Sequence, residues 1–224
     1  MKRFLVAGIA LAVIALIVIV NFTAVFDVRD IRAVGVDGPT SQLIIDSAAI
    51  ANGTPLARVN PGAVATSVQR EVPEVGSIQV QRKWPHTVVI KATPRRVAAN
   101  VSVDGVVRWA DQTGFVFGSI DKPRTGVPTI IVKPDFASDL AGRQGAIADA
   151  LTVFQALPPA VKRALARIEY RSQNNIVITT KSRRTIRWGS AADSTRKALV
   201  LAALLGRKAR FYDVRTPDLP TTKK

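Results

Sequence analysis

An uncharged apolar run near the start of the chain constrains this protein more than any other feature. From Phe4 to Phe26 there is no Lys, Arg, Asp, Glu or His, and Leu11–Val20 contains only Leu, Ala, Val and Ile. An α-helix rises about 1.5 Å per residue, so about 20 apolar residues cross a hydrocarbon core of about 30 Å. The run therefore predicts one membrane-spanning helix over residues 4–26.

The residues that flank this run predict its orientation. Lys2 and Arg3 precede it, and the positive-inside tendency places residues 1–3 in the cytoplasm as a short tail and residues 27–224 outside. A cleaved signal peptide is the alternative. Its apolar core would be about 7–15 residues, shorter than this run, and Thr23–Phe26 offers no A-x-A cleavage site. We therefore expect a membrane anchor.

The net charge of the chain indicates what kind of partner it binds, and its Cys and His content limits the kinds of site it can contain. The chain has 32 Lys and Arg against 16 Asp and Glu, a net charge of +16. Such a charge often indicates nucleic acid binding, but the predicted topology places most of it outside the cell. Anionic lipid head groups or anionic wall polymers are the expected counterparts, and a solvated basic surface is the alternative. With no Cys and one His, disulfides and the usual zinc sites are excluded.

Turn and cap residues divide the rest of the chain into two units of an α+β fold. Residues 27–95 are expected to form a β-α-α-β-β unit, residues 96–216 a mainly antiparallel β domain with helices, and residues 217–224 a C-terminal tail. In the first unit the pattern predicts strands at 27–36, 76–83 and 87–93, with helices capped by Thr40 or Ser41 and by Asn60. In the second it predicts strands at 97–103, 105–109, 115–117, 128–132, 166–170, 176–180, 185–188 and 210–215, with helices around 147–154 and 190–206.

No catalytic, cofactor-binding or metal-binding constellation is found. The pattern S-x-x-K occurs at Ser119–Lys122 and Ser194–Lys197, and Arg124–Gly126 loosely imitates K-T-G. Penicillin-recognising enzymes draw these motifs from distant parts of a larger domain and add S-D-N, which is absent here. We therefore expect no enzyme, no cofactor and no metal, and acylation of Ser119 or Ser194 by a labelled β-lactam would overturn this expectation.

Several motifs follow one another in the order typical of one family. Val80–Thr87 joins the end of one predicted strand to the start of the next and contains Arg82, Trp84 and Pro85, as in the family's strand–Arg-x-Trp-Pro-x-Thr–strand pattern. Asp111–Phe117 is similar to an Asp-x-x-Gly-x-x-Phe turn, and Tyr212–Pro217 to a terminal strand. The chain thus resembles the FtsQ/DivIB cell-division proteins, mainly the actinobacterial ones, and its first unit resembles their POTRA domain. The family's linking segment has the pattern Glu-Arg-x-Pro-x-Ala. The corresponding segment here, Thr93–Ala98, lacks the acidic residue and has its proline at another position.

The resemblance implies a non-enzymatic, single-pass scaffold of the bacterial plasma membrane, located at the division septum. Its implied partners are FtsB/DivIC-like and FtsL-like proteins, with FtsW, FtsI and FtsK in the same machinery, and its implied role is control of septal peptidoglycan synthesis. Two alternatives stay open: a membrane-anchored cell-wall enzyme, and a POTRA-containing transport or assembly protein. The second expects tandem POTRA units or a following barrel, and neither is visible in the sequence.

The terminal strand is the predicted docking site for a partner. It comes last in the sequence, so we expect it at a sheet edge, where unpaired main-chain groups can bind another chain. Pro217 and Pro220 would limit uncontrolled pairing beyond it. The predicted partner-binding residues are Arg210, Phe211, Tyr212, Asp213, Val214, Arg215 and Thr216. The alternative is that Phe211 and Val214 pack on the preceding helix. Trp84 is expected at the junction of the two units.

Overall fold

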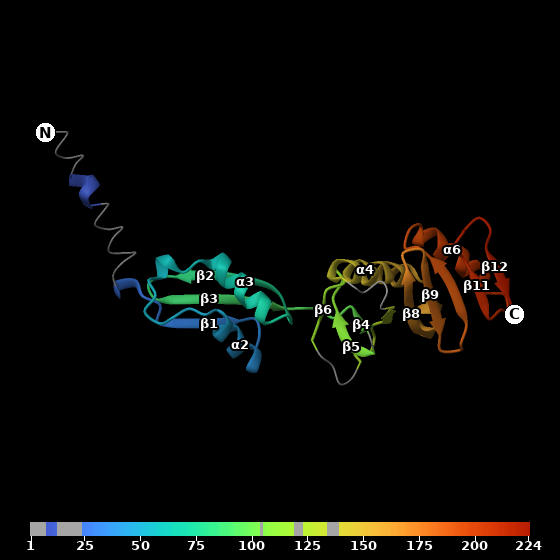
Figure 1. Ribbon diagram of the computed structural model, residues 1–224, viewed down its shortest axis with the longest axis horizontal. Coiled ribbons are helices and arrows are strands. Elements are labelled where there is room, and N and C mark those ends of the chain that lie inside the picture. Colours follow the sequence, from blue (N-terminus) through green and yellow to red (C-terminus); the bar gives the residue numbers. More distant parts are fainter. Residues whose placement is uncertain (1–7, 13–23, 104, 119–122, 134–138) are drawn as a thin grey trace. The chain divides into compact units, whose positions relative to one another are not determined.

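The computed structural model describes residues 8–12, 24–103, 105–118, 123–133 and 139–224 (Figure 1). The predicted membrane helix, residues 4–26, lies largely outside the described residues. No helix within the described parts is both long and apolar enough to span a membrane. The chain divides into two units, Met1–Arg95 and Arg96–Lys224.

The first unit is a three-stranded sheet covered by two helices. The strands pair in the order β1-β3-β2, with β1 parallel and β2 antiparallel to β3. This arrangement confirms the predicted β-α-α-β-β order. Its elements are η1 (Ala24–Phe26), β1 (Asp30–Val34), α2 (Pro39–Ser47), η2 (Leu56–Arg58), α3 (Pro61–Glu71), β2 (Val75–Lys83) and β3 (Thr87–Pro94).

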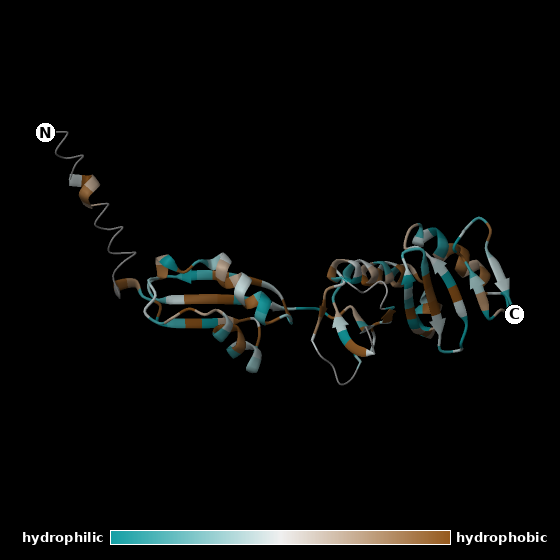
Figure 2. Ribbon diagram, viewed as in Figure 1, coloured by the Kyte–Doolittle hydropathy of each residue, from teal (hydrophilic) through white to brown (hydrophobic). Residues whose placement is uncertain are grey.

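The residues at the helix starts and the spacing of apolar residues explain how this unit folds. The Asn60 side-chain oxygen accepts from the amides of Gly62 and Ala63 at 3.0 and 3.2 Å, which confirms the predicted cap of α3. The predicted cap of α2 is wrong. That helix begins at Pro39 with no side-chain cap, because proline already suits a first turn. The core brings together both helices and β3, whose hydrophobic colour is visible in Figure 2.

The second unit is built on one mixed sheet. Its nine described strands lie in the order β12-β11-β10-β9-β8-β7-β4-β5-β6. The elements are β4 (Ala99–Val103), β5 (Val106–Ala110), β6 (Val116–Phe117), β7 (Thr129–Val132), α4 (Leu140–Ala156), α5 (Pro159–Ala164), β8 (Leu165–Ser172), β9 (Asn175–Thr180), β10 (Thr185–Gly189), α6 (Ser194–Leu204), β11 (Phe211–Asp213) and β12 (Thr221–Lys223).

Strand direction in this sheet follows from the connections. Five of the eight neighbouring pairs are antiparallel, as expected for a mainly antiparallel domain. The pairs β4–β7, β7–β8 and β10–β11 are parallel. Helices α4 and α5 connect β7 to β8, and α6 connects β10 to β11, as parallel neighbours require a crossover. Helices α4 and α6 contact each other, and α4 packs on β7 and β8, so one face of the sheet is covered.

The turn after β5 shows why its motif needs those residue types. One carboxylate oxygen of Asp111 accepts from the amides of Thr113 and Phe115 at 2.8 and 3.1 Å. Gly114 has φ +83°, and a Cβ there would lie 2.2 Å from the carbonyl oxygen of Gln144 on α4. Only glycine therefore allows the turn to approach α4 so closely.

Candidate partner-binding surfaces

The end of the large sheet differs from the sequence prediction in one respect. The strand predicted as the edge is β11, and it lies between β10, its parallel neighbour, and β12, its antiparallel neighbour. The prediction that this strand is the edge is therefore wrong. Residues Thr221–Lys223, expected to belong to a tail, form β12, which has no second neighbour among the described strands.

Two of the predicted partner-binding residues belong to the core. Tyr212 and Val214 are fully buried. The Tyr212 hydroxyl donates to the carbonyl oxygen of Arg207 at 3.0 Å, and the Val214 amide donates to the carbonyl oxygen of Arg187 at 3.0 Å. These hydrogen bonds join the β11 segment to β10 and to the connection that follows α6. The prediction that these two side chains contact a partner is wrong, because both are buried in the core.

The other predicted residues remain accessible. Phe211 is half-buried, with the Arg187 guanidinium 5.4 Å from its ring centre. Arg210, Arg215 and Thr216 are exposed. The Arg215 guanidinium lies 2.8 Å from the carboxylate of Asp213. Partial burial alone would raise the pKa of Asp213, but the hydrogen bonds and charge of Arg215, with the charge of Arg187, lower it below its ordinary value.

Strand β12 presents main-chain groups to solvent. The carbonyl oxygen of Lys223 accepts from the Arg210 amide at 3.0 Å, so Lys223 directs its main-chain groups toward β11. Neighbouring residues in a strand alternate in this direction, so the amide and carbonyl of Thr222 face the open side. The surroundings are cationic, because exposed basic side chains flank the edge at Arg207, Lys208, Arg210, Lys223 and Lys224.

Sequence reasoning missed β12 because its signal is weak. Three residues, two of them the β-branched Thr221 and Thr222, are too few to show an alternating pattern. Pro220 directly precedes the strand, and a proline after the last predicted strand indicates that the regular structure has ended. The pairing to β11 is a tertiary contact, which no local pattern records.

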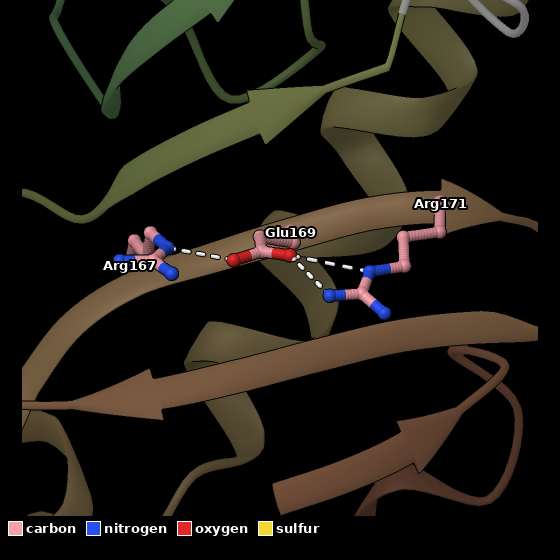
Figure 3. A network of polar contacts seen from close by, with 3 residues as sticks. All are labelled: Arg167, Glu169 and Arg171. Carbon is pink, nitrogen blue, oxygen red and sulfur yellow. Dashed lines mark hydrogen bonds and ion pairs between the residues drawn. The ribbon is translucent and has the colours of Figure 1, made fainter. Parts of the chain in front are cut away.

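The sheet face opposite the helices carries a charged row. Glu169 on β8 lies between Arg167, whose Nε is 2.6 Å from one carboxylate oxygen, and Arg171, whose guanidinium is 2.7 Å from the other (Figure 3). Ile168 and Tyr170 alternate with them into the core. Partial burial would raise the pKa of Glu169, but its hydrogen bonds and charge interactions with Arg171 and Arg167 lower it below its ordinary value.

A basic pocket of about 460 Å³ lies near α5. Arg124, Lys162, Arg163 and Lys181 line it, and none of its described lining residues is Asp or Glu. Buried Asn100 holds one wall, because its side chain donates to the carbonyl oxygen of Arg124 at 2.9 Å and accepts from the Arg124 amide at 2.8 Å. The pocket suits a small anionic group.

The POTRA motif residues lie in the first unit. Arg82 donates to the carbonyl oxygen of Ala57 at 2.9 Å, which ties β2 to η2. Trp84 and Pro85 form the turn between β2 and β3, and Trp84 is 51% exposed. Its ring makes an edge contact with Phe26, with ring centres 5.3 Å apart. This aromatic contact lies within the first unit, and the expectation that Trp84 packs at the junction of the units stays a prediction.

Ser194 and Lys197 form structural contacts. The Ser194 hydroxyl donates to the carbonyl oxygen of Ala191 at 2.7 Å and accepts from the Trp188 indole at 3.0 Å. The Lys197 amine donates to the carbonyl oxygen of Ser190 at 2.9 Å, and burial lowers its pKa despite the nearby charge of Asp193. Both groups hold the β10–α6 connection. Ser119, in the other S-x-x-K match, lies outside the described residues, and no cluster of metal-binding side chains occurs within the described ones.

Comparisons with known proteins match both units. Residues 26–93 match the family model "POTRA domain, FtsQ-type", and residues 99–219 match "Cell division protein FtsQ/DivIB, C-terminal". The cell division protein FtsQ of Streptomyces griseus is 30% identical over 86% of this chain and 95% of its own length. That of Mycobacteroides abscessus is 33% identical over 98% of this chain and 68% of its own.

Another relative and a solved structure are also similar to this chain. The FtsQ protein of Mycolicibacterium smegmatis is 32% identical over 97% of this chain, which spans 63% of that relative. The major extracytoplasmic domain of DivIB from Geobacillus stearothermophilus gives a TM-score of 0.35 and 18% identity, over 52% of this chain and 98% of that one. The assignment rests on the sequence matches, which cover both units in order. The chain belongs to the FtsQ/DivIB family of bacterial cell division proteins.

Proposed function

We propose that this chain is a non-enzymatic scaffold of the divisome with a single membrane anchor. Residues 4–26 cross the plasma membrane, the N-terminus lies in the cytoplasm, and both units lie outside it at the division septum. The observation that carries this proposal is the ordered pair of an FtsQ-type POTRA domain and an FtsQ/DivIB C-terminal domain. The uncharged run from Phe4 to Phe26 supports the anchor.

The docking site in this proposal is the β12 edge. An added strand from a partner would pair with the main-chain groups of Thr222, and each such hydrogen bond contributes about 0.5–1.5 kcal/mol. Exposed Arg210, Arg215 and Lys223 favour a partner segment rich in Asp and Glu. The residues predicted from the sequence then divide into a supporting strand, β11, and the exposed basic side chains beside it.

The expected partners are other membrane proteins of the divisome. FtsB/DivIC-like and FtsL-like proteins would bind the β domain and the POTRA domain, and FtsW, FtsI and FtsK belong to the same machinery. Through these contacts the scaffold would control septal peptidoglycan synthesis. Family membership supports this proposal.

The basic pocket near α5 adds a second mode of contact. Four basic residues line it, and none of its described lining residues is Asp or Glu. An anionic lipid head group or a charged group of a wall polymer would complement them. This contact would keep the β domain close to the envelope without catalysis.

Depletion of the protein tests the proposed function. With a fluorescent fusion as the only copy, we expect a mid-cell signal, and depletion should give cells that grow without septation. Diffuse membrane signal and normal division after depletion would refute the scaffold role. A fusion that lacks residues 4–26 should lose the mid-cell signal if the anchor is required.

A further inference from the structure

The β2–β3 turn, Trp84–His86, is held against the point where the apolar run ends. The Trp84 ring packs edge-on against Phe26, the last residue of that run, with ring centres 5.3 Å apart. The Nδ1 atom of His86 lies 3.0 Å from the carbonyl oxygen of Asp27. The aromatic contact and the polar contact thus join the turn to two consecutive residues.

Main-chain pairing makes this attachment rigid. The amides of Arg29 and Asp30 both donate to the carbonyl oxygen of His86, at 3.0 and 3.3 Å. The parallel pairing of β1 with β3 starts directly after the turn, where Asp30 is opposite Thr87. The turn cannot move away from residues 26–30 without breaking the sheet. In Figure 1, η1 lies at the end of the sheet where β3 begins.

Apolar surface is exposed at this end of the unit. Trp84 is 51% exposed and Val25 is 55% exposed, next to half-buried Phe26. A tryptophan that is half exposed beside a second ring and an aliphatic residue forms a small apolar patch. Indole has an apolar body and one N–H group, and it accumulates where a membrane meets water.

The charges around the patch have the sign that anionic lipids attract. Arg29, with a side chain 60% exposed, and exposed Arg82 and Lys83 lie in or beside the contacts just described. The nearest acid is Asp27, whose carboxylate is 2.9 Å from Arg29 and 3.4 Å from His86. Basic residues near an anionic membrane surface are attracted to it by about 1 kcal/mol each.

We propose that Trp84, with Val25 and Phe26, inserts into the head-group region of the membrane, while Lys83 and Arg29 contact lipid phosphates. The inference rests on the proposed anchor, because that anchor brings Phe26 to the membrane surface. The Phe26 contact then brings Trp84 to the same depth. The POTRA domain is thereby attached to the membrane at two points, its chain entry and its β2–β3 turn, which restricts its rotation about the anchor.

Tryptophan quenching by brominated lipid tests this inference. The full chain is reconstituted into vesicles of phosphatidylcholine and phosphatidylglycerol, with and without bromine on the upper acyl chain. We expect strong quenching in the wild type and loss of most of it in Trp84→Phe, which keeps a ring beside Phe26. Trp109→Phe is the matched control and should keep the quenching, and Trp188 is fully buried. Vesicles without phosphatidylglycerol should give less quenching.

Two results would overturn the inference. Equal quenching of the wild type and Trp84→Phe, in vesicles where protease protection shows an inserted chain, would leave the anchor standing and show that Trp84 does not enter the membrane. A chain that alkaline carbonate extracts from the vesicles would refute the anchor and the inference together. Near-ultraviolet circular dichroism of Trp84→Phe checks that the fold is kept.

Discussion

At the scale of single residues, the open face of the large sheet uses carboxylates as bridges between guanidinium groups. Glu169 accepts from Arg167 and Arg171, and Asp213 pairs with Arg215. In a chain with a net charge of +16, each such carboxylate relieves repulsion between cations on neighbouring positions. These acids therefore contribute to stability although the arginines remain partly exposed.

Replacement of Glu169 by Gln measures this contribution. Because the pKa of Glu169 is lower in the folded than in the unfolded chain, its stabilisation is complete above the ordinary carboxyl pKa and disappears as pH falls through the folded-state value. We expect Glu169→Gln to lower the free energy of unfolding by about 1 kcal/mol at neutral pH, since the arginines are about half exposed. Denaturant titrations should show the two proteins converging in acid.

The matched control is Glu71→Gln. Glu71 pairs with Arg70 at the C-terminal end of α3, and its side chain is 56% exposed. Its replacement should change the free energy of unfolding by nearly zero at either pH. An equal loss in both variants would show that net charge, rather than the bridge on β8, is responsible.

At the scale of elements, the decisive feature is which strand is the edge. The buried strand β11 is short, and β12 completes the sheet with three residues. Phe211 pairs with Lys223, and Asp213 pairs with Thr221. The main-chain amide and carbonyl of the middle residue of β12, Thr222, therefore point away from β11. A partner strand would therefore bind β12 mainly through hydrogen bonds to the amide and the carbonyl oxygen of Thr222.

Replacement of Thr222 by proline tests whether a partner strand binds in this way. Thr222→Pro removes the outward N–H and should weaken binding of a partner segment roughly tenfold or more, since a hydrogen bond is lost and the ring hinders pairing. Thr222→Val keeps the N–H and the β-branched shape, so its affinity should match the wild type. Isothermal titration with the purified partner measures both, and equal affinities for the two variants would exclude strand addition at β12.

Local patterns predicted most elements because they are short-range signals. The Asn60 cap, the alternation in β2 and the Asp111–Gly114 turn each depend on residues within a few positions. The parallel pairs, the edge position of β12 and the contact of Trp84 with Phe26 join distant residues, so the sequence alone did not show them. The sheet edge was predicted at β11 and lies at β12, because β12 has too few residues for a pattern.

At the scale of the whole molecule, the two units have separate hydrophobic cores. One core gathers residues from Val28 to Ala92, and the other residues from Ala99 to Val214. Among the residues that the structure describes, no buried residue belongs to both cores. Each unit should therefore unfold and bind partners with little dependence on the other.

Paired core substitutions test this independence. Ile90 and Ile178 are each fully buried, one in each core. We expect Ile90→Ala and Ile178→Ala to destabilise their own units by about 2–5 kcal/mol, as buried isoleucine truncations do. Hydrogen exchange of the full chain, followed by peptide, should show lost protection only in the unit that carries the substitution. Equal loss in both units would contradict separate cores.

The central claim is that a divisome partner binds at the β12 edge, and site-specific photo-crosslinking in dividing cells tests it most directly. The photoreactive residue is placed at exposed Thr221 or Lys223, since Tyr212 is fully buried, and at exposed Gln69 on α3 as the comparison. We predict that Thr221 and Lys223 capture a membrane protein of the division machinery and that Thr222→Pro strongly reduces the yield of this product. Crosslinks to division proteins from Gln69 alone would contradict the account.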